Sequence, residues 1–519
     1  MQDASGNIVC APGYTSAAIA TLSSTCAPLD VFGIGQASQS ALDYITSIAK
    51  TTQNNSQLDI VADVNGSIFT LPGGDVKVSL GYEHRRESVN FNPGAFYYGQ
   101  DNGDGTRTQY GNSIPIDPVS GAYHTNEGFG ELDVPLVSPD MHVPLVHSLN
   151  LQGSGRYVNN SLTGGFWSYT GGGSYSPVQD ITFRGNYTRS FRAPAITEAF
   201  APRGSVFDTA NDPCDPRYIG GGPDPARRAA NCAAAGVPTT MPDPTDPTKT
   251  VPFSSNVVDF TAPGTFGGNP NLKNETANSW TAGAVIEPRF LPGFKVSADY
   301  IAIDVSNEIA APTLTDLMDA CYDAADFPTN SFCSTFTRNS AGQVTSFAEG
   351  NFNIGIEHFR ALQAELDYEF PLSRLGLPDS AGSILLNVNY LHTFSHYTRV
   401  GEADKEYSVG TTQEPTDNLT ANFNYNNGGF NFLWQTQYYG PTKLDVNVPD
   451  SNYQYPKVHQ YFMFNTSVGY DLGKHYTVRL VVNNVLNKGV PFPGTDLSET
   501  RYFDALMGRY FKINVGVKF

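Results

Sequence analysis

The sequence has no long hydrophobic run. Nowhere in its 519 residues do roughly 18 consecutive apolar residues occur, the minimum for a membrane-spanning helix. A chain without such a helix crosses a membrane only as a closed β-barrel, because lipid offers the backbone no partner except a neighbouring strand. Charge is also sparse, at 16% of residues, and the net charge is -19. This acidic balance excludes a nucleic-acid binder, which needs a basic surface for phosphates.

Motifs for catalysis, nucleotide binding and metal binding are also absent. Neither the P-loop pattern nor H-E-x-x-H occurs, and no group of His, Cys and Asp residues has the spacing of a metal site. Glu365 and Asp367 look like an acid/base pair, but a solvated strand face explains them with fewer assumptions. The isolated histidines are interpreted as polar surface or lumen groups: His84, His142, His147, His392 and His396. We therefore predict no enzyme, no metal and no cofactor.

What the sequence contains is typical of strands and turns. It has 28 tyrosines, 32 phenylalanines and 50 glycines, but only 3 tryptophans. Its last residues alternate without interruption, with an apolar face formed by Phe511, Ile513, Val515, Val517 and Phe519. Residues 362–370 also alternate, with carboxylates on a face that suits a water-filled lumen and not lipid. The pattern predicts an all-β fold, a transmembrane antiparallel β-barrel.

The alternation recurs along the chain and predicts 15 strands. They span residues 57–70, 75–88, 124–136, 144–158, 163–175, 180–190, 275–287, 294–306, 352–370, 382–396, 415–425, 430–439, 459–470, 475–486 and 508–519. Short turns at 71–74, 426–429 and 471–474 alternate with longer loops, which is the asymmetry of outer-membrane barrels. We predict that these three turns lie on one side, the periplasmic one. Residues 57–519 then form the barrel.

Six cysteines fall into three local pairs, Cys10 with Cys26, Cys214 with Cys232, and Cys321 with Cys333. Many connectivities are formally open to six cysteines, and a zinc site would need C-x-x-C or nearby histidine pairs, which are missing. We predict a disulfide in each pair, each contributing roughly 3 kcal/mol in an oxidising compartment. Residues 1–56, with the first pair and a short helix around 37–48, are interpreted as an extracellular loop.

Two stretches carry a family resemblance. Residues 190–198, SFRAPAITE, and 269–276, NPNLKNET, resemble the SFRAPxxxE and NPxLKPET segments of TonB-dependent outer-membrane receptors, with Asn274 where the family usually has Pro. The matching positions are Phe191, Arg192, Ala193, Pro194, Glu198, Asn269, Pro270, Leu272, Lys273, Glu275 and Thr276. Residues 482–488, which include Asn484, are similar to the NLFDK stretch of the family. The terminal Phe519 resembles the C-terminal signal of such barrels.

The resemblance implies a monomeric outer-membrane receptor that contacts lipid and imports a scarce nutrient of the siderophore-iron, cobalamin or oligosaccharide class. In this family a periplasmic TonB-type protein supplies energy through a plug domain. We expect the long loops 191–274 and 307–351 to capture the ligand. The alternatives are a passive porin, which is a smaller barrel, and a secreted all-β adhesin, glycan-binding protein or sugar hydrolase, which would show paired carboxylates in a cleft.

The strand count also predicts that the chain is part of a longer protein. Its 15 strands fall short of the roughly 22 of an outer-membrane transporter, and an odd number of antiparallel strands does not close without a parallel seam. The first residues have neither a basic segment nor an apolar one of the kind found in signal peptides. We therefore expect the signal peptide, the plug and about seven strands to lie upstream.

Overall fold

The computed structural model describes residues 5–6, 8, 27–46, 48–108, 114–401, 404–491 and 503–518. Three predicted site residues, Cys10, Cys26 and Phe519, lie outside the described residues. No helix in the described part of the chain is long and apolar enough to span a membrane.

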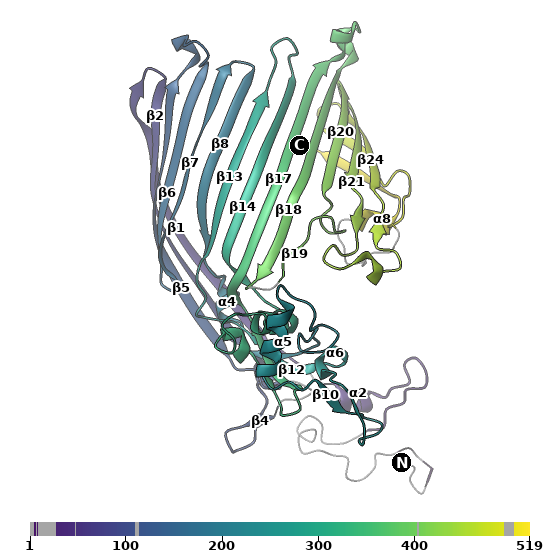
Figure 1. The fold of residues 1–519 in the computed structure, drawn as a ribbon. Coiled ribbons are helices and arrows are strands. Elements are labelled where there is room, and N and C mark those ends of the chain that lie inside the picture. Colours follow the sequence, from purple (N-terminus) through teal and green to yellow (C-terminus); the bar gives the residue numbers. More distant parts are fainter. Residues whose placement is uncertain are drawn as a thin grey trace.

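One large antiparallel sheet dominates the fold (Figure 1). Its main path runs in chain order through β1 (Thr52–Leu71), β2 (Gly74–Asn92), β5 (Val119–Val137), β6 (Ser148–Asn160), β7 (Gly164–Val178), β8 (Ile181–Arg192), β13 (Glu275–Ile286), β14 (Phe294–Ala310), β17 (Phe352–Pro371), β18 (Ser383–Val400), β20 (Asp417–Asn427), β21 (Phe430–Tyr439), β24 (Tyr461–Leu472), β25 (Tyr476–Asn483) and β26 (Tyr510–Val517). The sixteenth strand, β19 (Glu406–Tyr407), pairs with β18. All the predicted strands are therefore present, and the all-β fold is confirmed.

Several strand boundaries differ from the sequence prediction, and two of the differences have a clear cause. β1 begins at Thr52, so residues 52–56 belong to the sheet and not to the preceding loop. β6 begins at Ser148 and not at 144, because His142 and Leu145 have φ values of 54° and 60°. A left-handed backbone conformation does not continue an extended strand.

The two ends of the sheet carry different connections. At one end are the tight turns after β1, β20 and β24, together with the links 138–147, 179–180, 287–293 and 372–382. Strands alternate in direction, and the three tight turns each follow an odd-numbered strand of the path, so they lie on the same side as predicted. The other end carries the long loops, with the short turn 161–163 as the exception. Short turns mark the periplasmic side and long loops the extracellular side.

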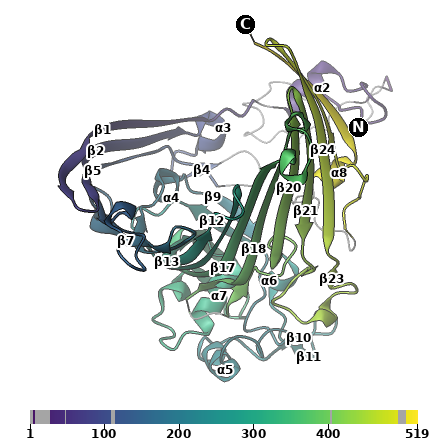
Figure 2. The ribbon, with the colours of Figure 1, turned by 90° about the horizontal axis from the view of Figure 1, so that it is seen from above.

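The sheet is an open arc in the described residues. β1 pairs with β2 and β26 pairs with β25, and neither strand has a second partner there. From above, the wall curves from β1 through β7 and β17 to β24 (Figure 2). Large apolar side chains on the outward faces of many strands are exposed, as Leu80, Trp167 and Ile513 illustrate, which is expected where lipid replaces a protein core.

The two longest loops, 193–274 and 311–351, form one small body that we call the cap. The first contributes α4 (Ile196–Phe200), β9 (Gly204–Asp208), α5 (Pro225–Ala234), β10 (Thr240–Pro242), β11 (Thr250–Pro252), α6 (Asn256–Asp259) and β12 (Ala262–Gly267). The second contributes α7 (Leu314–Tyr322), the 3-10 turn η2 (Ser331–Ser334), β15 (Phe336–Arg338) and β16 (Val344–Gly350). A four-stranded sheet, β15-β16-β12-β9, joins the loops through the parallel pair β12–β16.

The largest apolar core of the described chain lies in the cap and not in the barrel wall. Leu314, Leu317 and Met318 on α7 are fully buried and pack with Val257 and Phe253 from the other loop. Remaining small elements are α2 (Gln39–Ile45), α3 (Gly94–Tyr98), α8 (Phe503–Met507), β3 (Gln100–Asp101), β4 (Arg107–Thr108), β22 (Thr442–Lys443), β23 (Lys457–Val458) and the 3-10 turns η1 (Pro139–Met141), η3 (Leu372–Leu375), η4 (Asp379–Ala381) and η5 (Asp450–Asn452). Both cap loops contribute buried residues to this one core.

Candidate functional site

Two disulfides brace the cap from within. Cys214 is bonded to Cys232 in the last turn of α5, and Cys321 at the end of α7 is bonded to Cys333 in η2. These are the pairs that the sequence spacing predicts, one in each loop. Each disulfide closes a short loop of the chain and so restricts the unfolded state.

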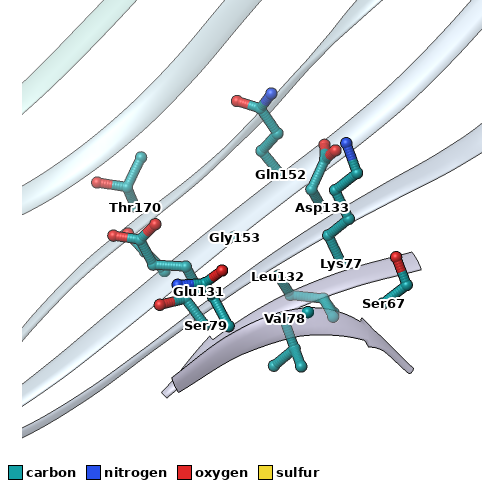
Figure 3. A pocket seen from close by; sticks show the side chains of 13 residues that line it. Ser67, Lys77, Val78, Ser79, Glu131, Leu132, Asp133, Gln152, Gly153 and Thr170 are labelled. Carbon is teal, nitrogen blue, oxygen red and sulfur yellow. The ribbon is translucent and has the colours of Figure 1, made fainter. Parts of the chain in front are cut away.

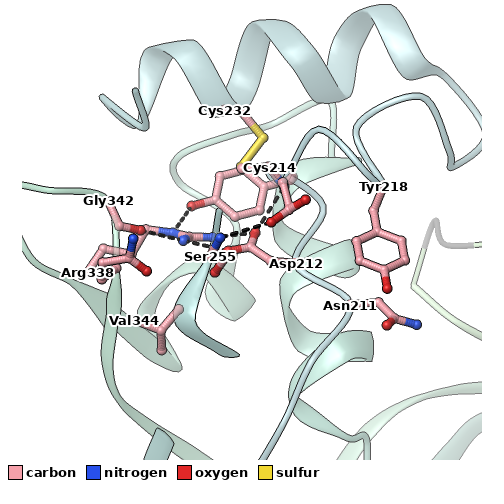
Figure 4. A network of polar contacts seen from close by, with 12 residues as sticks. Asn211, Asp212, Cys214, Tyr218, Cys232, Ser255, Arg338, Gly342 and Val344 are labelled. Carbon is pink, nitrogen blue, oxygen red and sulfur yellow. Dashed lines mark hydrogen bonds and ion pairs between the residues drawn. A yellow bond between two sulfur atoms is a disulfide. The ribbon is translucent and has the colours of Figure 1, made fainter. Parts of the chain in front are cut away.

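A buried ion pair joins the two cap loops (Figure 4). Arg338 on β15 donates from Nη2 and Nη1 to the carboxylate of Asp212, over 2.7 and 2.8 Å, and from Nε to the hydroxyl of Tyr322 over 2.9 Å. Both charged side chains are inside the cap, with exposed fractions of 9% and 0%. Burial alone would lower the pKa of Arg338, but Asp212 more than offsets this and keeps the pKa raised. The pair is fully hydrogen-bonded, as a buried charge must be.

A second buried pair spans the same two loops. Arg228 on α5 donates from Nε to Asp323 over 2.7 Å and from Nη2 over 2.5 Å, and the same Nη2 lies 2.9 Å from Asp319 on α7. Asn231, one turn further along α5, donates to the carbonyl oxygens of Tyr322 and Ala324. The first loop therefore contacts the end of α7 through a charged pair and an amide.

The family-motif residues meet where the cap joins the barrel, in a set of contacts that we call the collar. Arg192, the last residue of β8, donates to both oxygens of Glu275 on β13 over 2.6 and 2.7 Å. It also donates to Glu198 on α4 over 3.0 and 3.1 Å. Glu275 in turn accepts from the backbone nitrogen of Ile309 at the end of β14 over 2.7 Å. One arginine thus ties three chain segments together.

Asparagines complete the collar. The backbone nitrogen of Asn269 donates to the carbonyl of Glu198 over 2.9 Å, and its side chain donates to the carbonyl of Asn351 over 3.0 Å. Asn353 accepts from the Lys273 backbone nitrogen over 2.6 Å and donates to the carbonyls of Lys273 and Asn307. The exits of both cap loops are therefore hydrogen-bonded to each other. Sequence reasoning did not find Asn351, Asn353 or Ile309, which lie outside both motifs.

The remaining motif residues have packing or turn roles. Phe191 packs on Phe166 with ring centroids 5.1 Å apart, and Pro194 and Leu272 are buried. Thr276 pairs with Phe191 in the sheet, while Ala193 is half-buried and Pro270 and Lys273 are exposed. Asn484 has a φ of 50° and is buried, and its amide bridges the backbone of Lys488 over 2.7 Å in both directions. It closes the turn after β25 and is not one of the collar residues.

The inner face of the wall is polar. A cavity of 640 Å³ near the short turns is lined by Lys77, Glu131, Asp133, Gln152 and Thr170 among others (Figure 3). A neighbouring cavity of 550 Å³ shares Gln152 and Thr170 and contains the ion pair of Arg184 with Asp299. Glu365, predicted to face the lumen, lines this second cavity.

On the other half of the wall, side-chain amides form a continuous ladder. Asn387 donates to Asp367 over 2.8 Å, Asn422 to Asn387 over 3.2 Å, Gln435 to Asn422 over 3.0 Å, and Asn465 to Gln435 over 3.0 Å. These residues stand directly opposite one another on β17, β18, β20, β21 and β24. The ladder satisfies the inward polar groups without adding net positive charge.

The wall, the cap and the collar together define a receptor-type outer-membrane β-barrel. The family described as TonB dependent receptor-like, beta-barrel matches residues 14–485, and the chain belongs to this family. This family consists of outer-membrane receptors and not of enzymes, which confirms the predicted location and the prediction that the chain is not an enzyme. No curated relative matches the chain by sequence.

Solved structures agree on the fold. A mutant of the ferric enterobactin receptor PfeA from Pseudomonas aeruginosa, in complex with enterobactin, is 13% identical with a TM-score of 0.52. The siderophore receptor PirA from Acinetobacter baumannii is also 13% identical, with a TM-score of 0.54. Each likeness covers 90% of this chain but 55% of the other chain. The chain therefore spans about half the length of the solved structures that it matches.

Proposed function

We propose that this chain is the barrel part of a receptor that imports a scarce nutrient across the outer membrane with energy from a TonB-type partner, and that the cap captures the ligand. The observation that carries the proposal is the collar. The motif residues Arg192, Glu198 and Glu275 tie a folded, disulfide-braced body to the extracellular end of a polar-lined wall. A body of this kind is suited to holding a ligand above the lumen.

A passive porin has less need of such a cap. Porin loops constrict a water-filled pore, whereas here two loops form a body with its own apolar core and two buried ion pairs. A secreted adhesin or hydrolase would bury the apolar strand faces, yet residues such as Phe511 and Val515 are more than half exposed. Family membership and the exposed apolar faces both favour the receptor.

The ligand is proposed as a class. Siderophore-iron, cobalamin and oligosaccharide are the candidates that the family resemblance implies, and the structurally similar proteins are siderophore receptors by name. The lumen cavities are lined by polar side chains and by charges of both signs, as Lys77 and Glu131 illustrate.

The test is uptake by cells that make the intact receptor. Labelled ferric enterobactin, cobalamin and maltooligosaccharide would be offered with and without an uncoupler of the proton-motive force. We expect accumulation of one of them that the uncoupler abolishes, and loss of surface binding when residues 204–267 and 314–350 are both replaced by short Gly-Ser linkers. Uptake that persists with the uncoupler and without the cap would identify a passive pore and overturn the proposal.

A further inference from the structure

The outward face of β2 and β5 carries a basic hollow near its extracellular end. A cavity of 380 Å³ is lined by His84, Arg86 and His124 with Ala122 and Tyr123. Arg86 and His124 stand opposite each other on the two strands, and the rings of His84 and His124 lie 6.3 Å apart between centroids. We call these three side chains the basic hollow.

Charge is segregated between the two faces of these strands. On the inward face, Arg156 is paired with Glu83 over 2.8 Å and with Glu127 over 2.6 Å, and Arg85 lies 3.6 Å from Glu127. Within residues 52–60, 84–92 and 120–126 of β1, β2 and β5, the even-numbered residues lie on the outward face. None of them is a carboxylate. Within the described residues Arg86 forms no ion pair, although the whole chain is acidic.

The position of the hollow matches a membrane boundary. Arg86 is 12 residues from Gly74, where β2 leaves the short turn, which corresponds to about 40 Å along the strand and about 30 Å of height at a tilt near 40°. The apolar band of an outer-membrane barrel is about 25 Å tall. Directly below the hollow on the same face is Tyr82, followed by Leu80 and Val78. An aromatic residue between an apolar band and polar residues marks the headgroup level.

Hydrogen bonds fix the orientation of one ring. His84 Nδ1 lies 2.9 Å from Asn126 Oδ1, which also accepts from the hydroxyl of Tyr82 over 2.7 Å. Because the Asn126 oxygen accepts, Nδ1 is the donor in this contact, and Nε2 of the neutral ring is a hydrogen-bond acceptor. The guanidinium of Arg86 offers several N–H donors in a fixed fork, and phosphate is a group that such a fork binds strongly.

We infer that the basic hollow binds the phosphate of an outer-leaflet lipid headgroup. The apolar surface formed by Leu80, Val78 and Leu132 below it would contact the acyl chains of the same lipid. Basic pockets beside membrane-spanning segments recognise anionic headgroups in this manner. The site is on the outer surface of the wall and outside the lumen, and only Tyr123 of its lining packs against the cap, through Ile196. It therefore adds a lipid partner to the proposed receptor.

The test compares the full chain in detergent with variants. Binding of bisphosphorylated lipid A would be measured by native mass spectrometry and by titration in mixed micelles, with dephosphorylated lipid A and inorganic phosphate as the comparison ligands. We expect Arg86→Gln to weaken phosphorylated lipid A about fivefold and to leave the dephosphorylated lipid unchanged. Arg86→Lys is expected to retain most of the affinity because it keeps the charge.

Arg374→Gln is the matched control, because Arg374 is an exposed arginine at the opposite, short-turn side of the sheet. All variants must first show the heat-modifiable mobility of a folded barrel. Equal affinities for wild type and Arg86→Gln, or an equal loss in Arg374→Gln, would overturn the assignment. Effective competition by inorganic phosphate would also overturn it, since the hollow would then be a site for free anions and not for a lipid.

Discussion

Replacing Arg338 by Met tests whether the cap depends on the buried pair that joins its loops. The substitution keeps the volume of the side chain but removes the cation that faces Asp212, whose carboxylate has no exposed surface. It also removes the donor to Tyr322. Deleting one partner of a buried ion pair costs about 3–5 kcal/mol, because the remaining charge is buried without compensation. This loss corresponds to at least a hundredfold rise in the opening of the cap, at about 1.4 kcal/mol for each tenfold.

Hydrogen exchange of the backbone amides of α7 and β16 measures this opening directly. The control is Lys249→Met, which removes an exposed ion pair with Asp246 in the same cap and should cost no more than about 1 kcal/mol. The double variant Asp212→Asn with Arg338→Met should recover part of the loss, since no charge is then left buried. If Arg338→Met and Lys249→Met change exchange equally, the pair does not hold the cap together and the reasoning fails.

Three further predictions concern the cap and the collar. Burial and the nearby Asp208 raise the pKa of Glu349 from 4.5 to about 7, so the folded cap binds a proton that the unfolded chain has lost, and its stability should fall as pH rises from about 4.5 to 7. Glu349→Gln should reduce the slope of this dependence in thermal unfolding monitored at several pH values. The slope that remains is assigned to Asp319, because burial raises its pKa to about 7 as well. Replacing Cys214 and Cys232 by Ser should destabilise the cap by roughly 3 kcal/mol, measured as faster proteolysis of the 193–274 loop. Added reductant should then reduce the stability of the variant less than that of the wild type. Arg192→Gln should speed hydrogen exchange of the backbone amides at the cap exits by the equivalent of about 1–3 kcal/mol and leave the amides at the centre of β13 unchanged. If the exit amides are protected equally in the variant and in the wild type, the collar does not hold the cap to the barrel.

Period-two alternation was sufficient to predict the strands of the main sheet, because one face of each strand meets lipid and the other meets polar groups. The boundaries were less accurate. Residues 52–56 are polar on both faces and carry no alternation signal, so the pattern predicts a later start for β1 than the structure has. The backbone at His142 and Leu145 adopts a left-handed conformation, and neither residue is a glycine that would indicate it in the sequence. The pattern therefore predicts a start for β6 that is too early.

The sequence predicts that the two long loops capture the ligand, but it does not predict that they form one body. Asp212 and Arg338 are 126 residues apart, and neither lies in a repeating pattern that would indicate a partner. The parallel pairing of β12 with β16 is also a contact between loops that sequence periodicity does not encode. The loop boundaries shift as well, because β8 continues to Arg192 and β14 to Ala310. Tertiary contacts, and not local propensity, determine this part of the fold.

The collar explains why motif residues lie at the ends of strands and not in the middle of the loops. β8, β13 and β14 each lead into or out of the cap, and Arg192, Glu275 and Ile309 join them at that point. Neither loop has a core of its own, since Val257 from one packs with Leu314 from the other. Removing one loop therefore exposes the apolar surface of the second, and a single-loop deletion would report unfolding of the cap as a loss of ligand binding. Only removal of both loops together, above an intact collar, separates ligand capture from the folding of the cap.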